Sequence, residues 1–219
     1  MRKIDYIEDV IHKLTGGNPS QDDLDAYHPE VVANTINEVL LQVCLILFIK
    51  LKKSQDFDVF DTLLKTYTVD VVEENDKYYS VLPVSIINSI PTYLSIRRVY
   101  PVNADDTNSV DAVDFSLMDA EAMAIIKNLP AYKVMGTPIM HLKGNRLYYD
   151  NINTSTKQVV MVLMPEFNEY DDLDEVSMPS LAEASVIDMV YEKFRPTQVT
   201  PADVIADNLK LADAQTPKK

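Results

Sequence analysis

The sequence predicts an α+β fold: N-terminal helices, then a small, mostly antiparallel β-sheet with one inserted helix, then C-terminal helices. Two observations predict this class. Apolar residues recur with a period of about 3.6 near both ends of the chain, and they alternate with polar residues in its middle. Apolar residues make up 47% of the 219 residues, which is enough for a hydrophobic core. We divide the chain into regions 1–54, 55–165 and 166–219.

Two helices are predicted in region 1–54. Gly16–Gly17 favour a left-handed end for the first helix, and Pro29 suits the first turn of the second, which runs to about Lys53. The apolar positions of the first helix are Ile4, Ile7, Ile11 and Leu14. One face of the second helix carries Val32, Ile36, Val39, Val43 and Leu47.

The second half of that helix, Val39–Leu51, is apolar on nearly all of its faces. Such a helix must be covered on most sides, and we expect a neighbouring subunit to supply part of the cover. Its 13 residues, at about 1.5 Å each, span about 20 Å, less than the roughly 30 Å hydrocarbon core of a membrane. Gln42 and Lys50 also interrupt the segment, so we predict a buried helix and no membrane span.

Region 55–165 is predicted to be rich in β-strands. Gly144–Asn145 form a two-residue turn of the mirror type, which predicts a hairpin. Ser116 and Asp119 resemble a capped helix start, so the inserted helix is expected at 116–129, after an acidic loop at 105–114. The predicted strands are Thr62–Val72 with its partner Tyr78–Val84, then Ile96–Val102, Ile139–Leu142, Arg146–Tyr149 and Gln158–Met164.

Region 166–219 is predicted to hold an acidic loop, two helices and a frayed tail. Ser180 and Glu183 match a capping box for the first helix, and Thr200–Asp203 begin the second. We expect the first helix to bury Ala184, Ile187, Val190, Tyr191 and Phe194.

Net charge narrows the range of partners. The chain has 34 acidic and 20 basic residues, a formal charge of −14, and residues 166–219 carry half of it. A strongly negative surface repels phosphates, which argues against specific nucleic-acid binding. The densest acidic run is Glu166–Glu175, and a solvated loop is its simplest interpretation.

Composition also disfavours most catalytic classes. The chain has 4 glycines, 3 histidines and 1 cysteine, and they are not spaced as a dinucleotide fingerprint, phosphate loop or multi-cysteine zinc site requires. We therefore expect no enzyme, cofactor or metal site. Arg97–Arg98 is the only adjacent arginine pair, and it is either a docking contact for an acidic partner or a solvated edge position. Tyr79 and Tyr149, one from each Tyr-Tyr pair, are candidate interface residues.

The order of these segments resembles that of head-to-tail connector (adaptor or ring) proteins of tailed bacteriophages, particularly the crAss-like group. The resemblance covers about residues 25–210. The matching segments are YHPEVVANTINEVLLQ (27–42), DKYYSVLP (76–83), IRRVYPV (96–102), GNRLYYDN (144–151), QVVMVLMP (158–165) and PADVIADN (201–208).

The resemblance implies a structural virion protein, without catalytic activity or cofactor, that is assembled in the host cytoplasm. It would form a closed homo-oligomeric ring of about twelve copies between the portal and the tail. Its partners would be its own copies, the portal protein and other connector or tail proteins, with DNA passing non-specifically through the lumen. The alternatives are another virion or tail-tube-proximal protein, a non-viral interaction module, and, with less support, an enzyme of a type that the sequence does not reveal.

Two sets of candidate site residues follow. The candidate interface comprises Val39, Val43, Leu47, Tyr79, Tyr149, Arg97 and Arg98. The candidate acidic lumen comprises Glu166, Glu169, Asp171, Asp172, Asp174 and Glu175.

Overall fold

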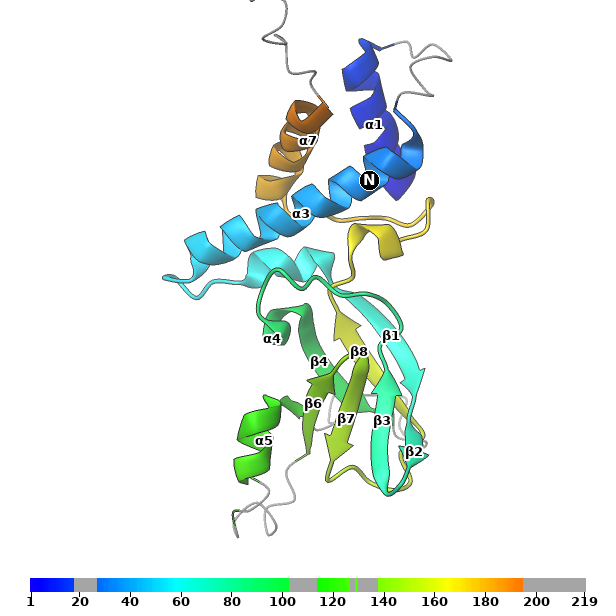
Figure 1. The fold of residues 1–219 in the computed structure, drawn as a ribbon, viewed down its shortest axis with the longest axis vertical. Helices are drawn as coiled ribbons and strands as arrows, with labels where there is room; N and C mark the ends of the chain where they lie inside the picture. The colour runs from blue at the N-terminus through cyan, green and yellow to red at the C-terminus, as the bar shows by residue number, and fades with distance from the viewer. Residues whose placement is uncertain (18–26, 103–113, 127–128, 130–137, 195–219) are drawn as a thin grey trace, which may run out of the picture.

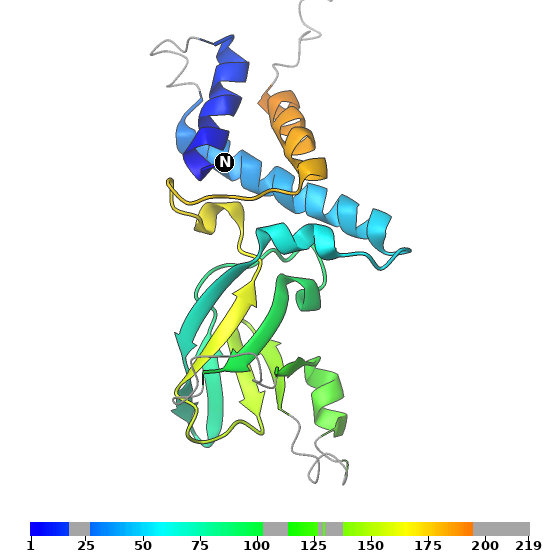
Figure 2. The same cartoon turned by 180° about the vertical axis from the view of Figure 1, so that it is seen from behind.

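The computed structural model describes residues 1–17, 27–102, 114–126, 129 and 138–194, and it confirms the α+β class. A helical body lies above a β-rich body in Figure 1, and Figure 2 shows the same two parts from behind. The helical body contains α1 (Lys3–Thr15), α3 (Pro29–Leu51) and α7 (Ser180–Phe194). Two short 3-10 helices, η1 (Asp58–Leu63) and η3 (Phe167–Glu169), lie between the bodies.

The two predicted N-terminal helices are confirmed. Gly16 ends α1 with φ at 73°, a left-handed conformation in which an L side chain would be strained. Pro29 occupies the first turn of α3, and the Nδ1 atom of His28 accepts a hydrogen bond from the Glu30 backbone N–H at 3.4 Å. Local sequence therefore determines both where α1 ends and where α3 begins.

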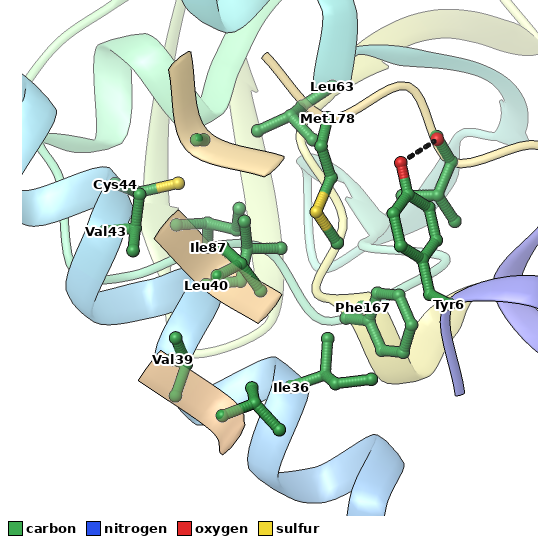
Figure 3. Close-up of a cluster of buried hydrophobic side chains, with 14 of the residues drawn as sticks. Tyr6, Ile36, Val39, Leu40, Val43, Cys44, Leu63, Ile87, Phe167 and Met178 are labelled. Atoms are coloured by element: carbon green, nitrogen blue, oxygen red, sulfur yellow. Dashed lines mark hydrogen bonds between the residues drawn. The ribbon is translucent and has the colours of Figure 1, made fainter. Parts of the chain in front are cut away.

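One core joins the N-terminal helices to the acidic C-terminal region. Its centre contains Ile36 and Leu40 from α3, Tyr6 from α1 and Phe167 from η3, as Figure 3 shows. The rings of Tyr6 and Phe167 meet edge to face, with centroids 6.3 Å apart. Regions 1–54 and 166–219 of our predicted division therefore share one hydrophobic core, because α3 packs against both α1 and α7.

The β-rich body has two sheets where the sequence predicted one. The first sheet has the strand order β1-β8-β4, and the second has the order β2-β3-β7-β6-β5. A second core of buried residues, including Val99, Leu147 and Met161, forms between these strands. The strands are β1 (Lys65–Asp70), β2 (Val72–Glu74), β3 (Lys77–Val81), β4 (Ile96–Pro101), β5 (Ser116–Leu117), β6 (Ile139–Lys143), β7 (Arg146–Asp150) and β8 (Gln158–Leu163).

The predicted pairing of residues 62–72 with 78–84 is wrong for most of its length. Strand β1 pairs antiparallel with β8, and only the three residues of β2 pair with β3. At Val71, between β1 and β2, the backbone N–H donates to the Lys157 carbonyl at 2.8 Å, and there the chain passes from one sheet to the other. Alternation fixes which side chains share a face, but it does not specify the partner strand.

The predicted turn at Gly144–Asn145 is confirmed, and a second two-residue turn joins β2 to β3. Gly144 lies in the turn between β6 and β7 and has a φ of 63°. Lys143 and Arg146, which flank the turn, are paired across the two strands. Asn75 and Asp76 connect β2 to β3 with φ at 52° and 59°. Positive φ at both central residues is the requirement of a type I′ hairpin turn, which asparagine and aspartate tolerate.

The inserted helix begins later than predicted. Ser116–Leu117 form β5, which runs parallel to β6, and the helix α5 (Ala120–Ile126) starts only after it. The backbone N–H of Ser116 donates to the Pro138 carbonyl, and that of Met118 donates to the Met140 carbonyl. The backbone before the helix therefore pairs with β6 and is not helical. All the other strand pairs of the two sheets are antiparallel, which confirms the mostly antiparallel prediction.

The C-terminal helix is confirmed, and its buried face is confirmed in part. Val190 is buried as predicted, and Ile187 and Phe194 are half-buried against the core. Ala184 is exposed instead, and Ala182 and Val186 are buried. Glu183 accepts a hydrogen bond from the Tyr6 hydroxyl at 3.0 Å, so the capping pattern does not account for its whole role. The second predicted helix, at 200–209, and most of the acidic loop at 105–114 lie outside the described residues.

Candidate functional site

The helix residues of the predicted interface lie inside the chain's own core. Val39, Val43 and Leu47 are at most 8% exposed and pack within the helical body. They are therefore covered without a partner, and this part of the interface prediction is wrong. The opposite side of the same helix is the side that solvent reaches.

The tyrosines chosen for the interface are also covered. Tyr149 is buried in the β core, and Tyr79 lies under the guanidinium of Arg146, which is 4.6 Å from the ring centroid. Tyr148 is the more exposed member of its pair, and its ring stacks on His141 at 5.3 Å. The sequence predicted that the two tyrosines of a pair point to opposite faces of the sheet. It could not predict which of the two faces solvent, because that depends on which face of the sheet packs against the core.

The aromatic side chains on the outer face of this sheet line a hollow of about 380 Å³. Tyr79, Tyr148 and His141 occupy directly paired positions on β3, β7 and β6. The rings pack against one another, and Tyr79 and Tyr148 lie 5.6 Å apart, so they mainly fill the sheet face. The rim mixes Lys77 and Lys143 with carboxylates and has no dominant charge.

Arg97 and Arg98 lie on the surface and have acidic partners within the chain. Arg97 is 3.6 Å from Asp61 of η1, and Arg98 forms two hydrogen bonds with Asp114, at 2.9 and 3.0 Å. The Asp114 carboxylate raises the pKa of the Arg98 guanidinium above its usual value. These contacts match the solvated edge position, one of the two interpretations that the sequence left open.

The acidic run Glu166–Glu175 divides into inward and outward carboxylates. Glu166 accepts a hydrogen bond from Asn37 at 3.1 Å, and Asp174 pairs with Lys65 at 2.6 Å. The Lys65 ammonium and the Asp171 backbone N–H lower the pKa of the Asp174 carboxyl. The run is anchored by two buried rings, those of Phe167 and Tyr170. The exposed carboxylates are those of Glu169, Asp171, Asp172 and Glu175.

A surface that the sequence did not specify lies on the C-terminal half of α3. Leu45, Ile46 and Ile49 are 41%, 42% and 62% exposed and share one face, because residues three and four apart are neighbours on a helix. We call these three residues the α3 patch. In Figures 1 and 2 this half of α3 projects beyond α7, which crosses the helix nearer its middle.

The α3 helix is also the one described helix that is long and apolar enough to cross a membrane. It has 23 residues, and half of its most apolar window is buried inside the protein. The partial burial of α3 agrees with the predicted core helix. The length and apolar composition of a helix do not by themselves show that it spans a membrane.

Few reactive groups come together in the described part of the chain. It contains no group of three or more His, Cys, Asp and Glu side chains that could hold a metal. Cys44 is buried within α3, and burial raises the pKa of its thiol to about 12, so the thiol stays protonated at neutral pH. His12, His28 and His141 lie in α1, at the start of α3 and in β6, and they form no common site.

Comparison with known proteins identifies no relative. The chain matches no protein-family model, and a search of curated proteins finds no similar sequence.

Proposed function

We propose that the chain is a structural virion protein that forms a ring with copies of itself in the head-to-tail connector of a tailed phage. The ring would lie between portal and tail and surround the path of the DNA. The order of sequence segments described above supports this proposal, and the α3 patch supports it independently.

The α3 patch is the observation that carries the proposal. A contiguous exposed apolar patch is often a functional contact surface, whereas singly scattered apolar side chains are ordinary. Leu45, Ile46 and Ile49 lie on a regular 23-residue helix whose other side is anchored in the core. A rigid apolar surface of this kind suits a subunit that packs against other subunits.

The exposed carboxylates suit a channel through which DNA passes. Glu169, Asp171, Asp172 and Glu175 are the members of the candidate lumen that can face a polyanion. Glu166 and Asp174 are engaged within the chain, so we leave them out of the proposed lumen. Like charges prevent phosphates from adhering, which would let DNA slide.

Co-expression with the portal protein of the same phage tests the proposal. We expect the chain to co-elute with the portal in size-exclusion chromatography, in about twelve copies per ring, because rotational assemblies close at a fixed number. A matched control is the portal mixed with the Leu47→Asp chain, whose core should be disrupted. A folded chain that fails to bind the portal at any tested concentration would refute the proposal.

A further inference from the structure

The structure also indicates how copies of the chain contact one another, an inference that rests on the proposed function. We propose that the ring forms head to tail, with the turn at 171–175 of one copy seated on the α3 patch of the next. We call this segment the Leu173 turn. In this contact Asp171, Asp172 and Glu175 face the neighbouring copy, so Glu169 is the exposed carboxylate of the candidate lumen that is left to face the DNA. The described residues of the same chain leave both surfaces exposed to solvent.

The Leu173 turn displays an apolar side chain at an acidic tip. Leu173 is 72% exposed, the highest value among the large hydrophobic residues described. Asp171, Asp172 and Glu175 surround it in sequence and are exposed. An isolated exposed leucine is ordinary, but this one is held in a fixed position by the residues around it.

Backbone hydrogen bonds hold the turn rigidly. The N–H of Asp174 donates to the Asp171 carbonyl at 2.9 Å, which closes the turn around Leu173. The N–H groups of Lys3 and Ile4 donate to the carbonyls of Asp174 and Asp172 at 3.0 and 3.1 Å. The Asp174 side chain is held by Lys65 in addition. A contact that is ordered before binding loses little conformational entropy when it binds.

The α3 patch has the opposite rim charge. Lys50, Lys52 and Lys53 follow the patch at the end of α3, and all three are exposed. Within the described residues no carboxylate forms an ion pair with any of them. An aliphatic surface beside three lysines complements a leucine beside three carboxylates in both polarity and charge.

The two surfaces lie on opposite sides of the helical body. In Figure 1 the end of α3 projects to the left and the yellow segment after η3 projects to the right, and Figure 2 shows the same separation reversed. Two different patches on opposite sides form a heterologous contact, which repeats from copy to copy and closes into a ring when the rotation allows.

A symmetric contact between two α3 patches is less favourable. It would bring Lys50, Lys52 and Lys53 of one copy close to the same lysines of the other. Like charges placed together across an interface oppose association. The acidic Leu173 turn removes this repulsion and replaces it with attraction.

Two single-face variants test the arrangement by analytical ultracentrifugation. Ile49→Asp alters only the α3 patch, and Leu173→Asp alters only the Leu173 turn. We expect the wild-type chain to self-associate beyond a dimer, and each variant alone to lose at least about tenfold in association constant. Mixing the two variants restores one intact contact per pair, so the mixture should form dimers and stop there.

Val31→Asp is the matched control, because Val31 is 50% exposed on the same helix but lies at its other end. It should associate as the wild type does, and higher salt should weaken wild-type association because the rim charges are solvent-exposed. A wild-type chain that stays monomeric at all concentrations would overturn the inference. So would a Leu173→Asp chain that still dimerises, which would indicate α3-to-α3 pairing.

Portal binding separates this inference from the proposed function. A wild-type chain that binds the portal but does not self-associate refutes the head-to-tail contact and leaves the connector function standing. If the chain self-associates through the two surfaces but does not bind the portal, the head-to-tail contact is supported and the connector function is refuted.

Discussion

Individual buried polar groups hold distant segments of the chain together. The Tyr6 ring lies in the helical core, and its hydroxyl donates to the Glu183 carboxylate at 3.0 Å. Asn37 connects α3 to η3 through its amide: its oxygen accepts from the Phe167 N–H at 2.8 Å, and its nitrogen donates to Glu166. These contacts join residues more than a hundred positions apart, which no local sequence pattern could specify.

Tyr6→Phe tests the first of these contacts. Removal of the hydroxyl should lower the free energy of unfolding by about 1 kcal/mol, the usual net value of a hydrogen bond, while the ring packing is kept. Urea denaturation followed by circular dichroism measures the change. Tyr93→Phe is the control, since Tyr93 is 53% exposed, and an equal loss in both variants would show that the hydroxyl of Tyr6 contributes nothing specific.

Alkaline pH should destabilise the fold through its buried tyrosines. Burial raises the pKa of Tyr6, Tyr149 and Tyr170 above the ordinary value for tyrosine. Above about pH 10 these groups lose protons in the unfolded state and keep them in the folded state, so unfolding becomes easier as pH rises. Each contributes up to about 1.4 kcal/mol per pH unit, and this stability is fully present below about pH 10.

The pH dependence of the urea midpoint measures this effect. Tyr170→Phe should make the decline between pH 10 and about pH 11 shallower, because one ionisable group is removed. The exposed Tyr93→Phe should leave the slope unchanged. Identical slopes for wild type and Tyr170→Phe would contradict the assignment of Tyr170 to the core.

At the scale of elements, α3 has two sides with different roles. Leu47 is 8% exposed and Ile49 is 62% exposed, although they lie two residues apart. The sequence predicted a buried helix here, and the face that it marked is the buried one: Val32, Ile36, Val39, Val43 and Leu47. The apolar pattern on the other faces could not show how much of them the rest of the chain covers. The positions of α1, α7 and η3 decide that, and they follow from contacts distant in sequence.

Leu47→Asp and Ile49→Asp separate the two sides. An unpaired charge at Leu47 should cost several kcal/mol and unfold the helical body, since a buried carboxylate has no compensating partner. Ile49→Asp should melt within a few degrees of the wild type. Thermal circular dichroism distinguishes them, and a Leu47→Asp chain with wild-type stability would contradict the buried-helix assignment.

Turns were the most predictable part of the β body, and strand partners were the least. The β6–β7 hairpin follows from Gly144–Asn145 alone, because a two-residue turn joins adjacent strands. The pairing of β1 with β8 joins residues almost a hundred positions apart, and nothing local to Lys65–Asp70 indicates it. The strand itself was predicted from alternation, and its exposure pattern confirms that alternation.

Gly144→Ala tests the hairpin turn. No heavy atom outside the neighbouring residues lies within 4 Å of the position that the new Cβ would occupy, so the cost is one of backbone conformation. A φ of 63° should make the alanine variant about 1 kcal/mol less stable. Gly144→Asn should lose less, because asparagine tolerates this region, and an unchanged urea midpoint for Gly144→Ala would argue against the turn geometry.

On the scale of the whole molecule, the chain combines two separate cores with a surface that has charges of both signs at different places. The net charge of −14 conceals the lysines at the end of α3, and in Figure 1 that end lies on the opposite side of the helical body from the segment after η3. The sequence predicted an acidic loop here, but it could not show that Asp174 turns toward Lys65 while Leu173 faces solvent. Those orientations depend on the contacts of the turn with Lys3, Ile4 and Lys65.

Native mass spectrometry of the wild-type chain mixed with the portal protein of the same phage tests the central claim most directly. The account predicts a complex in which one portal carries a closed ring of about twelve copies of this 24.8 kDa chain. Free portal beside monomeric chain, with the chain folded by circular dichroism, would contradict it.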